Sequence, residues 1–146
     1  MKVKDIMTPR VVSCPPTATV SQAAALMRDQ QVGSVMVVDG DNLLGLVTDR
    51  QITHTVVATG ADPKTVLVEE IMFTDFVPLE EDMDLLAAVR MQRELAMRRL
   101  PVLRDGKPVG IVSVSDIAAF VKECIDCVLV EGETRVLRSG GKLPRI

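Results

Sequence analysis

The chain has 146 residues, enough for one ordinary domain or two very small ones, and its 47% hydrophobic and 25% charged residues exclude a disordered chain. With 17 Lys and Arg against 20 Asp and Glu, the net charge is −3, which argues against nucleic acid as a partner. Three Phe, one His and no Trp or Tyr exclude aromatic stacking platforms and multi-histidine metal sites.

The elements predicted for the first half follow the order strand, helix, strand, strand, helix. They cover residues 11–14, 19–27, 35–38 and 43–48, with a closing helix from about Asp49. Thr19 is a good N-cap, and apolar residues recur after it at helical spacing. Asp39–Gly40 supplies the turn between the two longer strands. Residues 59–65 form a linker, because Gly60 and Pro63 break the helix.

The same order recurs 65 residues later without a gap. Ile6–Met7 returns as Ile71–Met72, and Gly45–Thr48 returns as Gly110–Ser113. The second set of elements is predicted at residues 76–79, 84–91, 100–103 and 108–114, with a closing helix from about Ser115. One copy is too small to bury both faces of its sheet. The sequence therefore predicts an α/β (α+β) fold of two β-α-β-β-α repeats, packed as a pseudo-two-fold pair.

The C-terminal segment is predicted to be partly flexible. Residues 128–137 alternate as a strand could, and Ser139–Lys142 has the composition of a flexible segment. Cys124 and Cys127 form a single CxxC motif, which we expect on or just past the end of the closing helix. With Cys14 they make three cysteines, so a full disulfide framework is impossible. A cytoplasmic location without membrane contact is expected, because no signal peptide or bilayer-spanning stretch is present in this sequence.

Five short motifs carry a resemblance to a known family. They are Asp5–Pro9, Val35–Asp39, Gly45–Arg50, Arg98–Val102 and Gly110–Asp116. Together, in this order, the motifs resemble a tandem pair of cystathionine β-synthase (CBS) domains, also called a Bateman module. The resemblance covers about residues 2–124. It assigns residues 1–62 to a first CBS domain, 63–124 to a second and 125–146 to a C-terminal tail.

The resemblance implies a regulatory, non-catalytic protein that requires no cofactor. CBS pairs bind adenosine ligands (AMP, ADP, ATP or S-adenosylmethionine) in clefts between the repeats and report to a partner protein, which the sequence does not identify. They also associate as dimers, so a homodimer is expected.

The second repeat supplies most of the residues expected to bind this ligand. Gly110 would let the strand approach it closely, while Ile111 packs inward. Ser115 is a good N-cap for a helix whose free N–H groups attract phosphate, with Ser113 nearby. Asp116 would accept hydrogen bonds from two ribose hydroxyls. The alternative is that Ser115 and Asp116 only cap the helix.

Further ligand-binding residues follow from the resemblance. Arg99, with Arg98 beside it, occupies the place from which a basic residue reaches phosphate in nucleotide-binding relatives. Val77 is placed among the binding residues as the repeat equivalent of Val12. A structural alternative for the two arginines is a solvated helix end.

The first repeat departs from this pattern. Gln51 stands where the second repeat has Asp116, so ribose recognition is weakened there. Thr48 keeps the hydroxyl that matches Ser113, and Arg50 is a candidate phosphate contact across the cleft. One good site and one degraded site are expected.

Two alternatives remain open. The chain could be a ligand-free, dimerising interaction scaffold, a reading with which Gln51 and the lack of aromatic residues agree equally well. It could also be a thiol redox or metal protein that uses Cys124 and Cys127, although no second CxxC is present to complete a zinc site.

Overall fold

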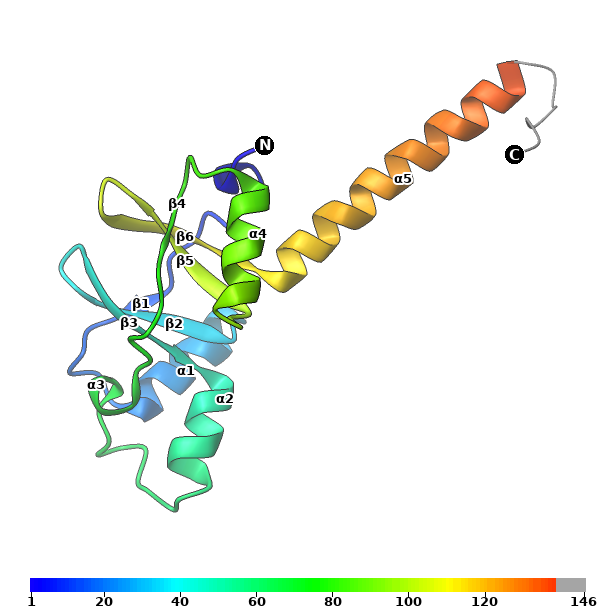
Figure 1. Cartoon of the computed structure of the whole chain (residues 1–146). Helices are drawn as coiled ribbons and strands as arrows, with labels where there is room; N and C mark the ends of the chain where they lie inside the picture. Colours follow the sequence, from blue (N-terminus) through cyan, green and yellow to red (C-terminus); the bar gives the residue numbers. More distant parts are fainter. Residues whose placement is uncertain (139–146) are drawn as a thin grey trace.

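A computed structural model describes residues 1–138, with side chains described as far as Val130. The predicted order of elements is confirmed in both halves (Figure 1). Repeat 1 contains β1 (Ser13–Cys14), α1 (Val20–Gln30), β2 (Ser34–Asp39), β3 (Asn42–Thr48), α2 (Asp49–Ile52) and a π-helical turn, Thr53–Val57. Repeat 2 contains β4 (Leu79–Glu80), α4 (Leu85–Glu94), β5 (Arg99–Arg104), β6 (Lys107–Ser113) and α5 (Val114–Arg138). A 3₁₀ turn, Val3–Asp5, precedes repeat 1, and the short helix α3 (Val68–Ile71) precedes repeat 2.

Each repeat forms its own three-stranded sheet with the same topology. The first strand pairs parallel to the second, which pairs antiparallel to the third. Both sheets also carry an irregularity at the same point, after Val37 in β2 and after Val102 in β5. These two residues are 65 positions apart, so the sequence repeat extends to the details of strand register.

Two hydrophobic cores lie beneath the sheets, and neither is built from one continuous half of the chain. The core of repeat 1 includes the fully buried Val68, which lies beyond the linker. The core of repeat 2 includes Val3, from the opposite end of the sequence, which is also fully buried. Each repeat therefore completes its core with a short segment that precedes the other repeat.

Backbone hydrogen bonds fix both exchanged segments in place. The N–H groups of Val3 and Lys4 donate to carbonyl oxygens of repeat 2 at 2.9 Å, and Thr8 pairs with Ile111 of β6 in both directions at 2.9 and 3.1 Å. In the equivalent place, Phe73 pairs with Leu46 of β3 at 2.8 and 3.0 Å. We call the Thr8–Ile111 pairing the Thr8 crossing, or N-terminal crossing, and the Phe73–Leu46 pairing the Leu46 crossing, or second crossing. Because each crossing joins residues far apart in the sequence, main-chain contacts hold the two repeats together.

Two glycines permit these crossings. A Cβ atom on Gly110 would lie 2.6 Å from the carbonyl oxygen of Thr8, and one on Gly45 would lie 2.8 Å from the sulfur of Met72. We expected Gly110 to allow the approach of a ligand. Its close neighbour is instead the backbone of the exchanged segment.

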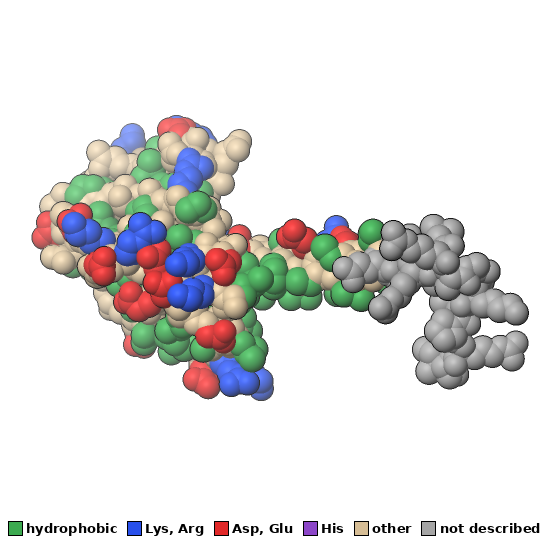
Figure 2. All heavy atoms as spheres, turned by 90° about the horizontal axis from the view of Figure 1, so that it is seen from above, with side chains coloured by type: hydrophobic (Ala, Val, Ile, Leu, Met, Phe, Trp, Pro, Cys, Tyr) green, Lys and Arg blue, Asp and Glu red, His purple; other side chains and the backbone are tan. Residues whose placement is uncertain are grey.

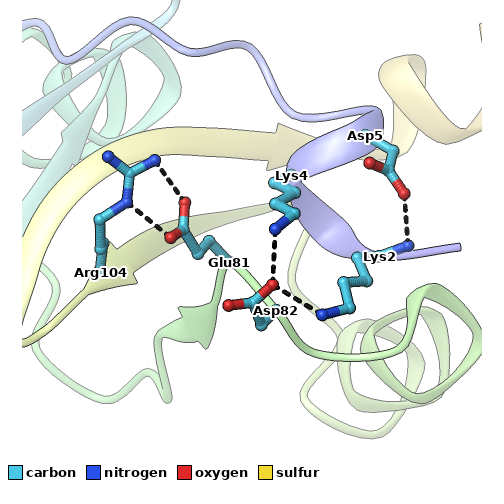
Figure 3. Close-up of polar contacts among 6 residues, drawn as sticks. All are labelled: Lys2, Lys4, Asp5, Glu81, Asp82 and Arg104. Carbon is cyan, nitrogen blue, oxygen red and sulfur yellow. Dashed lines mark hydrogen bonds and ion pairs between the residues drawn. The ribbon is translucent and has the colours of Figure 1, made fainter.

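Ion pairs add a second link between the N-terminal segment and repeat 2 (Figure 3). The carboxylate of Asp82 accepts hydrogen bonds from Lys2 at 2.8 Å and from Lys4 at 2.7 Å. Beside it, Arg104 holds Glu81 through two bonds of 2.5 and 2.7 Å. The hydrogen bonds from Lys2 and Lys4 lower the pKa of Asp82 to about 2.

The closing helix of repeat 2 corrects the prediction for the C-terminal segment. Residues 128–137 were expected to resemble a strand, but α5 continues through them to Arg138. No Gly or Pro interrupts residues 114–131, so nothing in this stretch stops the helix. Figure 1 shows α5 projecting away from both sheets. None of the described helices is both long and apolar enough to cross a membrane. The prediction for Ser139–Lys142 lies outside the described residues.

The first prediction concerns Gly110. Gly110→Ala should lower the free energy of unfolding by about 1–3 kcal/mol, because the new methyl group meets a backbone carbonyl that cannot move without breaking the Thr8–Ile111 pairing. Urea denaturation monitored by circular dichroism measures this change. Gly45→Ala should also destabilise the protein, since it disturbs the equivalent crossing. Unchanged stability in both variants would contradict the role of the crossings.

The second prediction concerns Asp82 and pH. A carboxyl group with a lowered pKa in the folded state stabilises the protein above its unfolded pKa, and this contribution disappears as pH falls through the folded pKa. Asp82→Asn should therefore melt at a lower temperature than the parent chain at pH 5–7, and the difference should shrink as the pH falls below about 4 and disappear below about 2. The matched control is Asp75→Asn, which should leave the melting temperature unchanged across this range. A difference for Asp82→Asn that stays the same between pH 5 and pH 2 would show that charge is not its cause.

Candidate functional site

A pocket of about 300 Å³ lies where the N-terminal crossing meets both repeats. Its walls come from the segment after the crossing, from the turn between α1 and β2, and from β6. The lining residues are Thr8, Arg10, Val12, Gln31, Val32, Ser34, Met36 and Ile111. Four of the eight are apolar, and polar groups lie at its Thr8, Arg10 and Ser34 sides. A small organic molecule with one flat apolar part fits such a lining.

Asp116 lies next to this pocket, at the start of α5. Its Oδ1 atom is 3.5 Å from the hydroxyl of Thr8, which lines the pocket. Its Oδ2 atom accepts from the backbone N–H of Ser113 at 2.7 Å and from the Ser113 hydroxyl at 2.6 Å. The Asp116 N–H donates to the Ser113 hydroxyl in return, at 3.2 Å. One carboxylate oxygen thus caps the helix, and the other faces Thr8.

This arrangement corrects the expected helix cap. We predicted Ser115 as the N-cap, but α5 begins at Val114 and the reciprocal bonds identify Ser113 as the capping residue. Ser115 is an exposed residue of the first turn. Ser113 caps the helix because its hydroxyl is three residues from a carboxylate, the spacing of a capping box.

Arg10 provides a positive charge on the pocket wall. Its guanidinium donates to the side-chain oxygen of Gln30 at the end of α1. The next residue, Gln31, ends α1 in the left-handed conformation with φ of 55°. This turn sends the chain into β2 and brings Gln31 and Arg10 to the same wall. Arg10 was not among the predicted site residues.

Arg98 and Arg99 lie at the junction of the repeats rather than among the residues that line the pocket. The Arg98 carbonyl accepts from the N–H of Val114, where α5 begins. A Cβ atom on Gly33 would lie 2.9 Å from the Arg99 guanidinium and 3.2 Å from the Asp49 carboxylate. Arg99 therefore lies beside the residue that precedes Ser34 of the pocket wall.

The first-repeat residues form a different local arrangement. Thr48 caps α2 by accepting from the N–H of Gln51 at 3.1 Å. The Gln51 amide donates to the carbonyl of Ile71, and its side-chain oxygen is buried without a hydrogen-bond partner. Arg50 is exposed at the start of the same helix. Gln51 therefore lies near the second crossing. None of these three residues lines the pocket beside Thr8, which we call the Thr8 pocket.

The predicted site residues therefore divide between two crossings. Ser113, Asp116, Gly110 and Ile111 lie at the Thr8 crossing. Val77 is the repeat equivalent of Val12. It follows Phe73 in the chain, so it belongs to the crossing at which Phe73 pairs with Leu46. The predicted set brings Asp116 together with Gly110 and Ile111, but not with Val77 or Thr48.

The sequence analysis missed the repeat 1 wall of the pocket. The missed residues are Thr8, Arg10, Val12, Gln31, Val32, Ser34 and Met36. The local signal was the Thr8–Pro9 pair after Ile6–Met7, which does not reveal the pairing of Thr8 with β6. That pairing joins positions more than a hundred residues apart, and no local pattern specifies it.

The remaining chemical groups do not form a second centre among the described residues. Cys124 and Cys127 lie within α5 and are exposed, while Cys14 is a buried residue of β1, as expected. Burial raises the pKa of the Cys14 thiol. No cluster of three or more His, Cys, Asp or Glu that could hold a metal ion occurs within the described part of the chain.

Comparison with known proteins establishes the family. The CBS domain model matches residues 3–58 and again residues 68–123, and the chain therefore belongs to the CBS-domain family. Both matches contain the full β-α-β-β-α order described above. Free-standing CBS pairs of this kind are regulatory modules rather than catalytic domains.

Relatives and solved structures support this assignment. CBS domain-containing protein YhcV of Bacillus subtilis is 38% identical over 116 residues, covering 80% of this chain and 82% of its own. A protein with CBS domains from Burkholderia ambifaria superposes with a TM-score of 0.76 at 30% identity, covering 83% of this chain and 93% of that one. A hexameric CBS-CP12 protein from bloom-forming cyanobacteria has a TM-score of 0.73 at 28% identity, covering 96% and 88%.

A third prediction tests the corrected cap. Asp116→Ala should lower the free energy of unfolding by about 1 kcal/mol, because it removes the acceptor of two bonds from Ser113. Ser115→Ala is the matched control one residue away, and it should change stability by less than about 0.5 kcal/mol. Thermal unfolding of the two variants measures both values. A larger loss for Ser115→Ala would restore the original assignment of the cap.

Proposed function

We propose that this protein is a sensor that binds an adenine nucleotide in the Thr8 pocket. The observation that carries the proposal is a pocket lined by residues of both repeats. It combines an apolar wall with a basic residue and has a carboxylate beside it. Its volume of about 300 Å³ lies at the lower end of the range for small-molecule sites. A nucleoside monophosphate is the size that this volume favours.

The chemistry of the pocket suggests how the ligand would lie. The adenine ring would occupy the apolar side, between Val12, Val32 and Met36. The ribose hydroxyls would donate to the Oδ1 atom of Asp116, displacing its long contact with Thr8. The phosphate would then face Arg10, whose planar guanidinium forms charge-assisted bonds with phosphate oxygens.

The equivalent position at the second crossing is less suited to a nucleotide. In place of Arg10 it has Asp75, and in place of Asp116 it has Gln51, whose amide is held by Ile71. A negative charge replaces the group that would attract phosphate. We therefore propose one occupied cleft, as the sequence predicted, although its basic residue is Arg10 rather than Arg99.

The position of the pocket supports a signalling role. Ile111 belongs to repeat 2, whereas the other lining residues belong to repeat 1 or to the segment that precedes it. A ligand that contacts both repeats favours one mutual arrangement over others. A partner protein that recognises this arrangement would then bind with an affinity coupled to nucleotide concentration.

We also propose that the protein self-associates. The solved CBS-CP12 relative is described as hexameric, and its match covers 96% of this chain. A match of that extent necessarily includes part of α5. Self-association and nucleotide binding are separate proposals, since neither requires the other.

Calorimetric titration with AMP, ATP, adenosine and S-adenosylmethionine tests nucleotide binding, and it gives the fourth prediction. Arg10→Ala should weaken AMP binding by at least tenfold, because it removes a charge-assisted contact with phosphate. It should change adenosine or S-adenosylmethionine binding much less, since neither ligand carries a phosphate. Thr8→Val should weaken all of them moderately.

Asp75→Asn is the matched control, because Asp75 holds the position equivalent to Arg10 at the second crossing. It should leave every affinity unchanged. Equal losses for the Arg10 and Asp75 variants would place the ligand elsewhere. If the unmodified protein binds none of the four ligands, the alternative of a ligand-free interaction scaffold is favoured.

A further inference from the structure

Gln31 lines the Thr8 pocket, and the proposed orientation of the nucleotide gives it no role. It ends α1 in the left-handed backbone conformation, with φ of 55° and ψ of 46°. Its side chain is exposed, and among the described residues nothing forms a hydrogen bond with its amide. The amide is therefore able to contact a bound ligand.

The equivalent residue of repeat 2 shows that helix termination does not require this side chain. Ala96, 65 positions after Gln31, has the same left-handed conformation with φ of 52°. Helices commonly place Gly or Asn at such a position, because a Cβ atom is disfavoured there. Repeat 2 reduces the side chain to one methyl group, whereas repeat 1 has a long amide beside the pocket. The amide is thus a feature of the pocket rather than of the turn.

Two main-chain groups on the apolar wall are already hydrogen-bonded within the protein. The N–H of Val32 donates to the carbonyl oxygen of Met27 at 3.0 Å. The carbonyl oxygen of Val12 accepts from the N–H of Met36 at 2.9 Å. Neither group is available to the polar edge of a base that lies on this wall, so side chains gain importance in recognising it.

The polar side chains of the lining have different capacities for recognition. In the proposed orientation Thr8 lies near the ribose and Arg10 near the phosphate, which leaves Gln31 and Ser34 for the base. A serine hydroxyl rotates to act as donor or acceptor and therefore discriminates little. An amide presents one donor and one acceptor side by side. Gln31 is consequently the side chain best able to distinguish one base from another.

Charge cannot make this distinction. AMP and GMP carry the same phosphate, so Arg10 attracts both equally. Figure 2 shows Lys and Arg side chains interspersed with Asp and Glu on the face of the body that it presents. A preference between the two nucleotides therefore depends on neutral polar groups at the base.

From these observations we propose that Gln31 makes the Thr8 pocket specific for adenine over guanine. Its amide oxygen would accept from the N6 amino group of adenine, and its amide nitrogen would donate to N7. Guanine carries the acceptor O6 in place of that amino group, so two acceptors would face each other. The proposal rests on nucleotide binding in the Thr8 pocket and names the residue that determines the base.

Calorimetric titration of Gln31→Gly with AMP and GMP provides the test and the fifth prediction. Glycine adopts the left-handed conformation without strain, so the variant retains the turn. AMP binding should weaken by about tenfold, because two neutral hydrogen bonds are lost, while GMP binding stays unchanged. The preference of the parent chain for AMP should therefore largely disappear. Ala96→Gly is the matched control, since it makes the same backbone change in repeat 2 and should alter neither affinity.

Two further measurements identify the contacting atoms. The analogue 7-deaza-AMP has a C–H group in place of N7, so the parent chain should bind it several-fold more weakly than AMP. Gln31→Gly should bind AMP and 7-deaza-AMP alike. Gln31→Arg presents two donors, which match O6 and N7 of guanine, and it should reverse the preference in favour of GMP.

The outcomes separate this inference from the proposed function. If the parent chain binds no nucleotide, both are wrong. If it binds AMP and GMP equally, or if Gln31→Gly retains the full preference for AMP, the pocket binds nucleotides but Gln31 does not determine the base. An equal loss of AMP binding in Ala96→Gly would likewise overturn the inference, because backbone freedom at the helix ends would then be the cause.

Discussion

The structure depends on the exchange of two short segments between the repeats. Thr8 pairs with β6 of repeat 2, and Phe73 pairs with β3 of repeat 1. Each crossing brings a fully buried valine, Val3 or Val68, into the core of the repeat that it joins. Cutting the chain at its linker would therefore leave both cores incomplete. A glycine on the strand allows each crossing, because any side chain there would collide with the segment.

The same exchange produces the candidate site. The Thr8 crossing carries Arg10 and Val12 to a wall shared with β2, and it places Thr8 next to Asp116. A ligand in this pocket would compete for a carboxylate that also caps α5 through Ser113. Helix capping uses the Oδ2 atom of Asp116, whereas the proposed ligand would use Oδ1, so one would not exclude the other. The pocket and the start of α5 are consequently neighbours.

Most of the secondary structure could be predicted from the sequence, because its signals are local. The Asp39–Gly40 turn and the capping residue Thr19 fix the neighbouring elements to within a few residues. The crossings could not be predicted in this way, since the pairing of Thr8 with Ile111 depends on the packing of both repeats. The helical continuation past Val128 was missed because alternating Val and Leu residues were interpreted at strand periodicity. Their spacing from Val114 onward fits a helix equally well.

The length of α5 has a mechanical consequence. A continuous helix of 25 residues is a rod of about 37 Å, attached to the body at the residues that neighbour the pocket. A tilt of about 10° at its base displaces the far end by ~6 Å. A rearrangement too small to disturb either hydrophobic core is thereby enlarged to a displacement comparable to a full helical turn. A change in the angle of α5 at the pocket would therefore become a larger change in the position of its far end.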